Sequence, residues 1–307
     1  MSASINTPVI FIIFKRTDTT QKVFEAIREA KPKQLLIIAD GPREQKIGEA
    51  EKCAATRKVV EAVDWDCQIF QNYSDVNLGC KQRVATGLNW AFSIVEEAII
   101  LEDDCLPHPT FFRYCEELLR KYRDDERVVT ITGTNLLNEW KYQHQSYHFS
   151  YYFNCWGWAT WKRVWQNYDV EMKLWAHPEI KARVKDVIAD SKQYLNRKKF
   201  LDDAYNGKID TWDYQFFFTC LINSGLSITP AINLVSNIGF SEEGSNTKLV
   251  HDQRANLPIQ TMKFPLQTPP AVAVDREYDY KRYKKVWDNS ISERIRRKFK
   301  RLTINYK

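Results

Sequence analysis

Three consecutive carboxylates, Glu102-Asp103-Asp104, are the residues whose types and spacing most clearly suggest chemistry in this chain. They follow the apolar run Ala98-Ile99-Ile100-Leu101, which has the length and composition of a buried strand. Adjacent carboxylates repel one another unless a cation lies among them, and a divalent ion with oxygen ligands is a suitable cation. The alternative is that the triplet only opens a loop or begins the next helix, which Cys105-Leu106-Pro107 also allows.

Asp213 is a second candidate carboxylate, because it stands shortly before the apolar run Phe216–Ile222. A helix that begins there places Asp213 in its first turn, where the helix dipole favours the ionised form by roughly 0.3–1 kcal/mol. An ionised carboxylate can accept a proton as a general base. Asp210 and the pair Asp202-Asp203 are the competing candidates, and an Asp in a first helical turn is more often a capping residue.

An aromatic-rich segment runs from Tyr147 to Trp165 and contains Trp156-Gly157-Trp158. Aromatic faces stack on the C–H surfaces of sugars, and glycine leaves room for a ligand. We therefore expect Trp156, Gly157, Trp158 and Trp212 to line an acceptor or sugar pocket. Tryptophan also buries a large area, so the alternative is that at least one of Trp156, Trp158 and Trp161 belongs to the core.

The elements that must position these residues alternate in type along the first third of the chain. Short apolar runs predict strands, and apolar residues at helical spacing predict helices. In chain order, the sequence predicts strand 9–14, helix 18–30, strand 34–39, helix 44–63, strand 67–71, helix 80–95 and strand 98–101. Such alternation predicts an α/β fold with a mostly parallel sheet flanked by helices.

Ligands of such sheets bind outside the carboxyl ends of the strands, where four loops of this chain should meet. These loops are Lys15-Arg16-Thr17-Asp18, Asp40-Gly41-Pro42-Arg43, Asn72 to Gly79, and the acidic triplet. Basic, glycine-containing and acidic loops together suit a nucleotide diphosphate with its metal ion. No GxGxxG or GxxxxGK[ST] motif occurs, so neither a dinucleotide site nor a Walker-type phosphate loop is supported.

The composition describes a globular protein with an uneven charge distribution. The chain has 307 residues, of which 44% are hydrophobic, and its net charge is +6. Residues 281–307 hold eleven Lys/Arg and two acids, a balance of +9, so residues 1–280 total −3. The body would therefore not attract nucleic acid by charge. No apolar stretch approaches the roughly 20 residues of a membrane span and no signal peptide is recognisable, so we expect a cytoplasmic location.

The basic tail could adsorb on a membrane. Apolar residues form one helical stripe with lysines and arginines around it, as in a helix that lies on an anionic membrane surface. The stripe consists of Ile291, Ile295, Phe299 and Leu302. The alternative is a terminal helix that packs this stripe on the domain.

The segment from Ala98 to Tyr114, AIILEDDCLPHPTFFRY, resembles the metal-binding segment of GT-A glycosyltransferases, most closely the N-acetylglucosaminyltransferase I group. The resemblance rests on the spacing of Glu102-Asp103-Asp104, Pro109, Phe111, Phe112 and Tyr114. Looser similarity extends from Thr7 to about Thr247. It implies a GT-A (Rossmann-like) catalytic domain over residues 1–265, with a nucleotide-binding half (1–104), an acceptor-binding half (105–265) and a C-terminal extension (266–307).

The resemblance also implies roles for the loops. Asp104 would bind Mn²⁺ (or Mg²⁺), which bridges the two phosphates of a nucleotide-sugar, while Glu102 and Asp103 contact the sugar or ribose or orient the metal site. The other expected donor contacts are Lys15, Arg16, Asp40, Gly41 and Arg83. Asp40 could equally be a turn residue and Arg83 a surface arginine. His251 is a candidate further metal ligand, with water and diphosphate as the favoured alternative.

Inverting GT-A enzymes place an Asp or Glu downstream of the metal motif, so the resemblance implies that Asp213 is the general base. The predicted function is that of a metal-dependent inverting hexosyl- or N-acetylhexosaminyltransferase. It would use a nucleotide-sugar donor, preferably UDP-linked, and a glycan or lipid-linked acceptor of surface polysaccharide synthesis. The alternatives are a sugar nucleotidyltransferase and a non-catalytic sugar- or nucleic-acid-binding protein.

Overall fold

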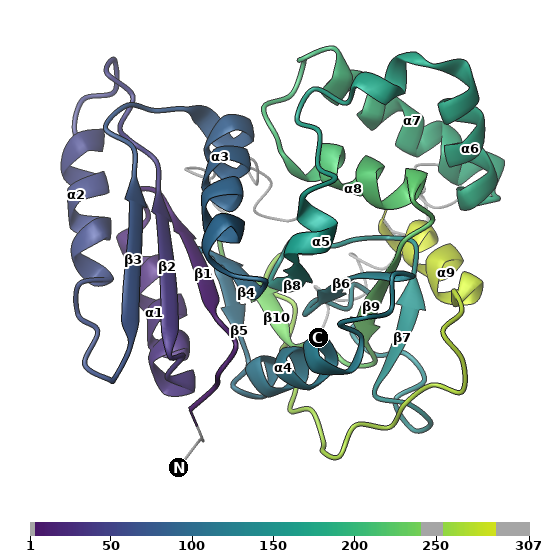
Figure 1. The fold of residues 1–307 in the computed structure, drawn as a ribbon, viewed down its shortest axis with the longest axis horizontal. Helices are drawn as coiled ribbons and strands as arrows, with labels where there is room; N and C mark the ends of the chain where they lie inside the picture. The colour runs from purple at the N-terminus through teal and green to yellow at the C-terminus, as the bar shows by residue number, and fades with distance from the viewer. Residues whose placement is uncertain (1–3, 241–253, 287–307) are drawn as a thin grey trace, which may run out of the picture.

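A computed structural model describes residues 4–240 and 254–286 of the chain (Figure 1). Within these residues a central sheet has eight strands in the order β3-β2-β1-β4-β8-β6-β9-β7. The strands are β1 (Val9–Ile13), β2 (Gln34–Ala39), β3 (Gln68–Tyr73), β4 (Glu97–Glu102), β6 (Val128–Thr132), β7 (Tyr147–Ser150), β8 (Trp158–Trp161) and β9 (Leu226–Pro230). Strands β5 (Cys105–Pro107) and β10 (Val235–Asn237) form a separate antiparallel pair.

The helices follow in chain order between and after these strands. They are α1 (Thr17–Ala30), α2 (Glu49–Val59), α3 (Gly79–Ile94), α4 (Thr110–Lys121), α5 (Lys162–Trp165), a 3-10 helix (Lys173–Ala176), α6 (Pro178–Ile188), α7 (Ser191–Tyr205), α8 (Asp213–Ile222) and α9 (Arg276–Val286). Helices α6, α7 and α8 gather at the upper right of Figure 1, and α9 lies beside β7. No helix in the described part of the chain is long and apolar enough to cross a membrane.

The first half of the sheet confirms the predicted fold class. Strand β1 pairs in parallel with β2 and β4, and β2 pairs in parallel with β3. All five residues of β1 are buried, and since successive side chains point to opposite faces, both faces of this strand are covered. Helix α2 begins at Glu49 rather than near Glu44, because Gly48 adopts a left-handed conformation (φ 78°) just before it.

The second half contains strands that the sequence did not predict. The aromatic-rich segment supplies β7 and β8, and β8 runs antiparallel to both β4 and β6. A single hydrophobic core extends from Ile5 to Met262 through both halves. The single domain expected over residues 1–265, and its division into donor and acceptor halves, stay predictions.

The short pair β5 and β10 brings a distant segment to the acidic triplet. Asn237 pairs with Cys105, and the N–H of Ile238 donates to the carbonyl oxygen of Asp104 at 2.8 Å. Residues 105–107 are therefore a strand rather than the start of a helix, and α4 begins only at Thr110. The triplet does not cap that helix. His251 and the basic stripe from Ser290 lie outside the described residues.

Candidate active site

The acidic triplet is organised around an arginine. Asp103 and Asp104 are 3% and 4% exposed. Arg16, in the loop after β1, lies against both: its Nη2 is 2.8 Å from Asp103 Oδ1, and its Nη1 is 2.9 Å from Asp104 Oδ2. The N–H of Phe14 also donates to Asp103 Oδ2 at 3.1 Å. Arg16, predicted as a donor contact, thus provides part of the positive charge that the carboxylates require.

Glu102 is the member of the triplet that keeps its carboxylate available. It is partly exposed, and no side-chain hydrogen bond to it is found among residues 4–240 and 254–286. Burial raises the pKa of Glu102 well above its usual range, and the charges of Asp104 and Asp103 raise it further. Burial also raises the pKa of Asp103, although Arg16 opposes this. The site therefore still favours additional positive charge.

The carboxylates of the acidic triplet suit a hard divalent ion, but they supply only some of the ligands that such an ion needs. Carboxylate oxygens suit Mn²⁺ and Mg²⁺, and Glu102 and Asp104 supply them. In the described ranges, no three His, Cys, Asp or Glu residues are arranged to hold a metal ion. An ion at this position would need ligands from phosphate and water as well, which is how Mg²⁺ commonly binds beside substrate phosphates.

Gly239 packs its backbone directly against this ion pair, so Gly239→Ala is expected to lower the free energy of unfolding by about 1–3 kcal/mol. A Cβ there would overlap Asp104 Oδ2 and the Nη1 of Arg16. Urea denaturation measures the change. Gly207→Ala is the comparison, because nothing lies within 4 Å of a Cβ at Gly207 and any loss there comes from its positive φ of 67°, which Gly239 does not share. Equal losses in the two variants would contradict the close packing at Gly239.

Asp40 holds the loop that follows β3. Its Oδ1 accepts the N–H groups of Gly41 (3.0 Å) and Leu78 (2.9 Å), and its Oδ2 accepts Gly79 N–H (3.1 Å) and Asn77 Nδ2 (3.0 Å). Burial raises the pKa of Asp40, while these hydrogen bonds and Arg83 oppose the rise. Asp40 therefore stabilises the turn that it begins and the loop after β3, and its contact with a nucleoside stays a prediction.

The other expected donor contacts already have protein partners. Lys15 Nζ lies 2.7 Å from Glu49 Oε2. Arg83 is 5% exposed and donates to the carbonyl and side-chain oxygens of Asn72 at 2.5 and 2.6 Å. At Gly41 a Cβ would come within 2.6 Å of the Val76 backbone, so glycine permits this loop contact. All of these loops lie where the parallel strands end, and their contact with a donor stays a prediction.

Asp213, the candidate general base, lines a cavity. It is the first residue of α8, is partly exposed and accepts a hydrogen bond from the Thr211 hydroxyl. Burial raises its pKa, although the hydrogen bond from Thr211 opposes the rise. The charge of Asp213 also contributes to the raised pKa of Glu102.

The competing candidates, Asp210, Asp202 and Asp203, form hydrogen bonds or ion pairs with other parts of the protein. Asp210 accepts the N–H groups of Cys80 and Lys81, both at 2.9 Å, at the start of α3. Asp202 accepts from Trp175 Nε1 at 3.0 Å and from Lys198, and Asp203 is 3.4 Å from Lys208. Asp213 therefore remains the candidate base.

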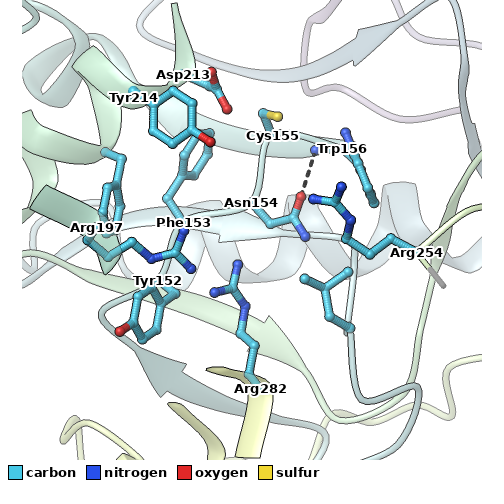
Figure 2. Close-up of a pocket in the computed structure, with 12 residues that line it drawn as sticks. Tyr152, Phe153, Asn154, Cys155, Trp156, Arg197, Asp213, Tyr214, Arg254 and Arg282 are labelled. Atoms are coloured by element: carbon cyan, nitrogen blue, oxygen red, sulfur yellow. Dashed lines mark hydrogen bonds between the residues drawn. The ribbon is translucent and has the colours of Figure 1, made fainter. Parts of the chain in front are cut away.

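A cavity of about 120 Å³ opens beside Asp213 and is lined by residues from several elements (Figure 2). Of the predicted pocket residues, Trp156 lines it, half-buried, with its ring edge-to-face against Phe240. Trp158 and Trp212 are instead core residues, 0% and 2% exposed, stacked with centroids 5.4 Å apart. Gly157 (φ 65°) packs against Val235, and Trp161 is also buried. The cavity lining includes three arginines that the sequence did not single out: Arg197, Arg254 and Arg282.

No family model matches the chain, and no curated protein sequence matches it. Solved structures resemble parts of it. The mannosyltransferase PcManGT from Pyrobaculum calidifontis, in complex with GDP-Man and Mn²⁺, is 14% identical over 53% of this chain and 46% of its own, with a TM-score of 0.37. TarS from S. aureus is 10% identical over 54% of this chain and 30% of its own, with a TM-score of 0.38.

The inositol-1-phosphate CTP transferase from T. maritima is 7% identical over 74% of this chain and 86% of its own, with a TM-score of 0.39. The mannosyltransferase match spans less than half of that enzyme's length. At these identities and TM-scores the likeness assigns the chain to no family. It offers no specific support for the N-acetylglucosaminyltransferase I group.

Proposed function

We propose that this protein is a metal-dependent inverting glycosyltransferase that moves a sugar from a nucleotide-sugar to an acceptor hydroxyl. One observation carries the proposal: the acidic triplet at the end of β4 is held against Arg16, and Asp213, the first residue of α8, lines a cavity. Metal-assisted departure of a diphosphate and deprotonation of an acceptor need these two kinds of carboxylate at neighbouring positions.

In the proposed mechanism, Asp213 accepts the proton of the acceptor hydroxyl. The acceptor oxygen then attacks the anomeric carbon from the face opposite the nucleoside diphosphate, which inverts the configuration there. The Thr211 hydroxyl, by donating to Asp213, holds the carboxylate in a fixed orientation. The raised pKa of Asp213 makes it a stronger base than an ordinary aspartate once it is ionised.

Asp104 and Glu102 would hold the metal ion, Mn²⁺ or Mg²⁺. When bound, the ion neutralises negative charge that develops on the departing diphosphate. Arg16 fixes Asp103 and Asp104 and adds its own positive charge next to the phosphates. We further propose UDP as the nucleotide, a glycan or lipid-linked acceptor of surface polysaccharide synthesis, and a cytoplasmic enzyme whose basic tail can adsorb on the inner face of the membrane.

Thermal stabilisation by UDP-, GDP- and CMP-sugars, with and without Mn²⁺, tests the function. A ligand at a hundred times its Kd stabilises the folded protein by about 2.7 kcal/mol, which raises the unfolding temperature by several °C. We expect such a shift with UDP-sugars only when Mn²⁺ is present. No stabilisation by any nucleotide-sugar would contradict the proposal. Release of pyrophosphate from a nucleoside triphosphate and a sugar 1-phosphate would instead identify a nucleotidyltransferase.

A further inference from the structure

Three arginines from separate elements converge on the cavity beside Asp213. Arg197 belongs to α7 and Arg282 to α9, and Arg254 lies at the start of the second described range. Figure 2 shows their side chains extending from three directions toward the centre of the cavity, with Asp213 and Tyr214 on another side. Arg197 and Arg254 are 57 positions apart in the sequence, and Arg254 and Arg282 are 28 positions apart, yet all three meet at this cavity. We call this cluster the arginine pocket.

Two of these arginines are almost fully buried. Arg197 is 4% exposed and Arg282 is 6% exposed. The Nη1 atom of Arg282 is buried and has no hydrogen-bond partner within the part of the chain that the structure describes. Burial lowers the pKa of Arg282 to about 10, and the neighbouring charge of Arg197 also contributes to this decrease. A buried guanidinium is costly unless a counter-charge or hydrogen-bond acceptors compensate it.

Among the described residues, the contacts of Arg282 compensate its charge only in part. The ring of Tyr152 contacts both buried guanidinium groups, and its centroid lies 4.9 Å from Arg197 Cζ and 4.8 Å from Arg282 Cζ. The Asp279 carboxylate, one turn before Arg282, attracts it but also accepts hydrogen bonds from Ser150 and Tyr151. The buried Nη1 of Arg282 still has no acceptor among the described residues, so an anion in the cavity could supply one.

We propose that the arginine pocket binds a phosphate or carboxylate group carried by the acceptor substrate. This proposal rests on the proposed function, which makes Asp213 the base for an acceptor hydroxyl. Guanidinium groups bind phosphate and carboxylate through paired hydrogen bonds of fixed geometry. An anion in the pocket would keep to the arginine side, because Asp213 repels it. The neutral hydroxyl of the same acceptor is then the part that can approach Asp213.

The size of the cavity favours an anionic group over a whole nucleotide. Its volume of about 120 Å³ is well below the roughly 300–1,000 Å³ of pockets that enclose a drug-sized ligand. The donor diphosphate has its own proposed position, at the metal site formed by Glu102 and Asp104. The arginine pocket and the metal site would then hold the two substrates on either side of the transferred sugar.

Calorimetric titration of the full chain at constant ionic strength, with inorganic phosphate and with acetate as probes, tests the proposal. We expect the wild-type protein to bind at least one of them, and Arg282→Gln to weaken that binding at least about tenfold while UDP·Mg²⁺ affinity stays within twofold. Tighter binding of phosphate would assign a phosphate-bearing acceptor, and tighter binding of acetate a carboxylate-bearing one. Arg254→Gln, at a half-buried position, should show the same selective loss if Arg282→Gln fails to fold.

Arg113→Gln is the control, because Arg113 is an exposed arginine on α4 whose partner is Glu117, and it should bind both ligands like the wild type. The same titration is repeated with saturating UDP·Mg²⁺, where we expect unchanged anion binding. Displacement of the anion by UDP·Mg²⁺ would assign the pocket to the donor and overturn the proposal. So would intact nucleotide binding with no anion binding. Failure of the wild type to bind any nucleotide would instead contradict the proposed function.

Discussion

Asp213→Asn is expected to lower the rate of sugar transfer by about 10²- to 10⁴-fold and to leave nucleotide affinity unchanged. The amide has nearly the shape of the carboxylate and can still accept the hydrogen bond from Thr211, but it cannot take a proton from the acceptor. Turnover with the donor found by the nucleotide-sugar screen gives kcat, and calorimetry gives the Kd of the nucleotide. Unchanged turnover would reject Asp213 as the base.

The pH dependence provides a second measure of the same role. Asp213 must be ionised to act as a base, and burial raises its pKa, so wild-type activity should fall on acidification at a higher pH than an ordinary aspartate would give. The residual activity of Asp213→Asn should lack this acidic decline. Asp203→Asn is a suitable control, because Asp203 is a carboxylate near the surface of α7 that pairs with Lys208. It should retain both the rate and the pH profile.

Asp104→Asn is expected to remove the metal-dependent part of nucleotide affinity, which we place at about 100-fold or more. The variant keeps the size of the side chain but removes the charge that would bind the ion. UDP titrations with and without Mn²⁺ measure the difference, and the wild type should show it while the variant should not.

Asp103→Asn separates the role of a metal ligand from that of an ion-pair partner. Asp103 and Asp104 both lie against Arg16 at almost the same distance, 2.8 and 2.9 Å. If Asp104 binds the ion directly, Asp103→Asn should lose much less of the metal-dependent affinity. Equal losses in the two variants would mean that both carboxylates act mainly by holding Arg16.

The sequence predicts the first half of the sheet well because its strands are short apolar runs separated by long helical segments. Strand β2 is found at the predicted residues, Gln34–Ala39, and the helices predicted around it are present. Strands β7 and β8 are four residues each and rich in aromatics, so no run or alternation marks them. They form strands because β4, β6 and β9 supply their hydrogen-bond partners. This long-range pairing cannot be read from a single sequence.

Some residues of the candidate site could also be predicted from the sequence, and others could not. The position of the acidic triplet could be predicted because a strand must end where its apolar run ends. The contact of Arg16 with that triplet follows from two loops that share one edge of the sheet. The arginine pocket could not be predicted, because Arg197 and Arg282 stand in lysine- and arginine-rich helices that look like exposed surface in the sequence. Conversely, Trp158 and Trp212 are of a residue type that often stacks on sugars, but both lie in the core and contribute to its packing.

The cap that Asp210 provides has a mechanical consequence for the two halves of the protein. Asp210 binds the N–H groups of Cys80 and Lys81, while the preceding residue, Gly79, donates to Asp40 at the end of β2. These hydrogen bonds connect the loop after β3 to Asp210, three residues before Asp213. The loop at Gly79 and the segment that leads into α8 are thereby held together, so a shift of that loop would also move the start of α8, where Asp213 lies.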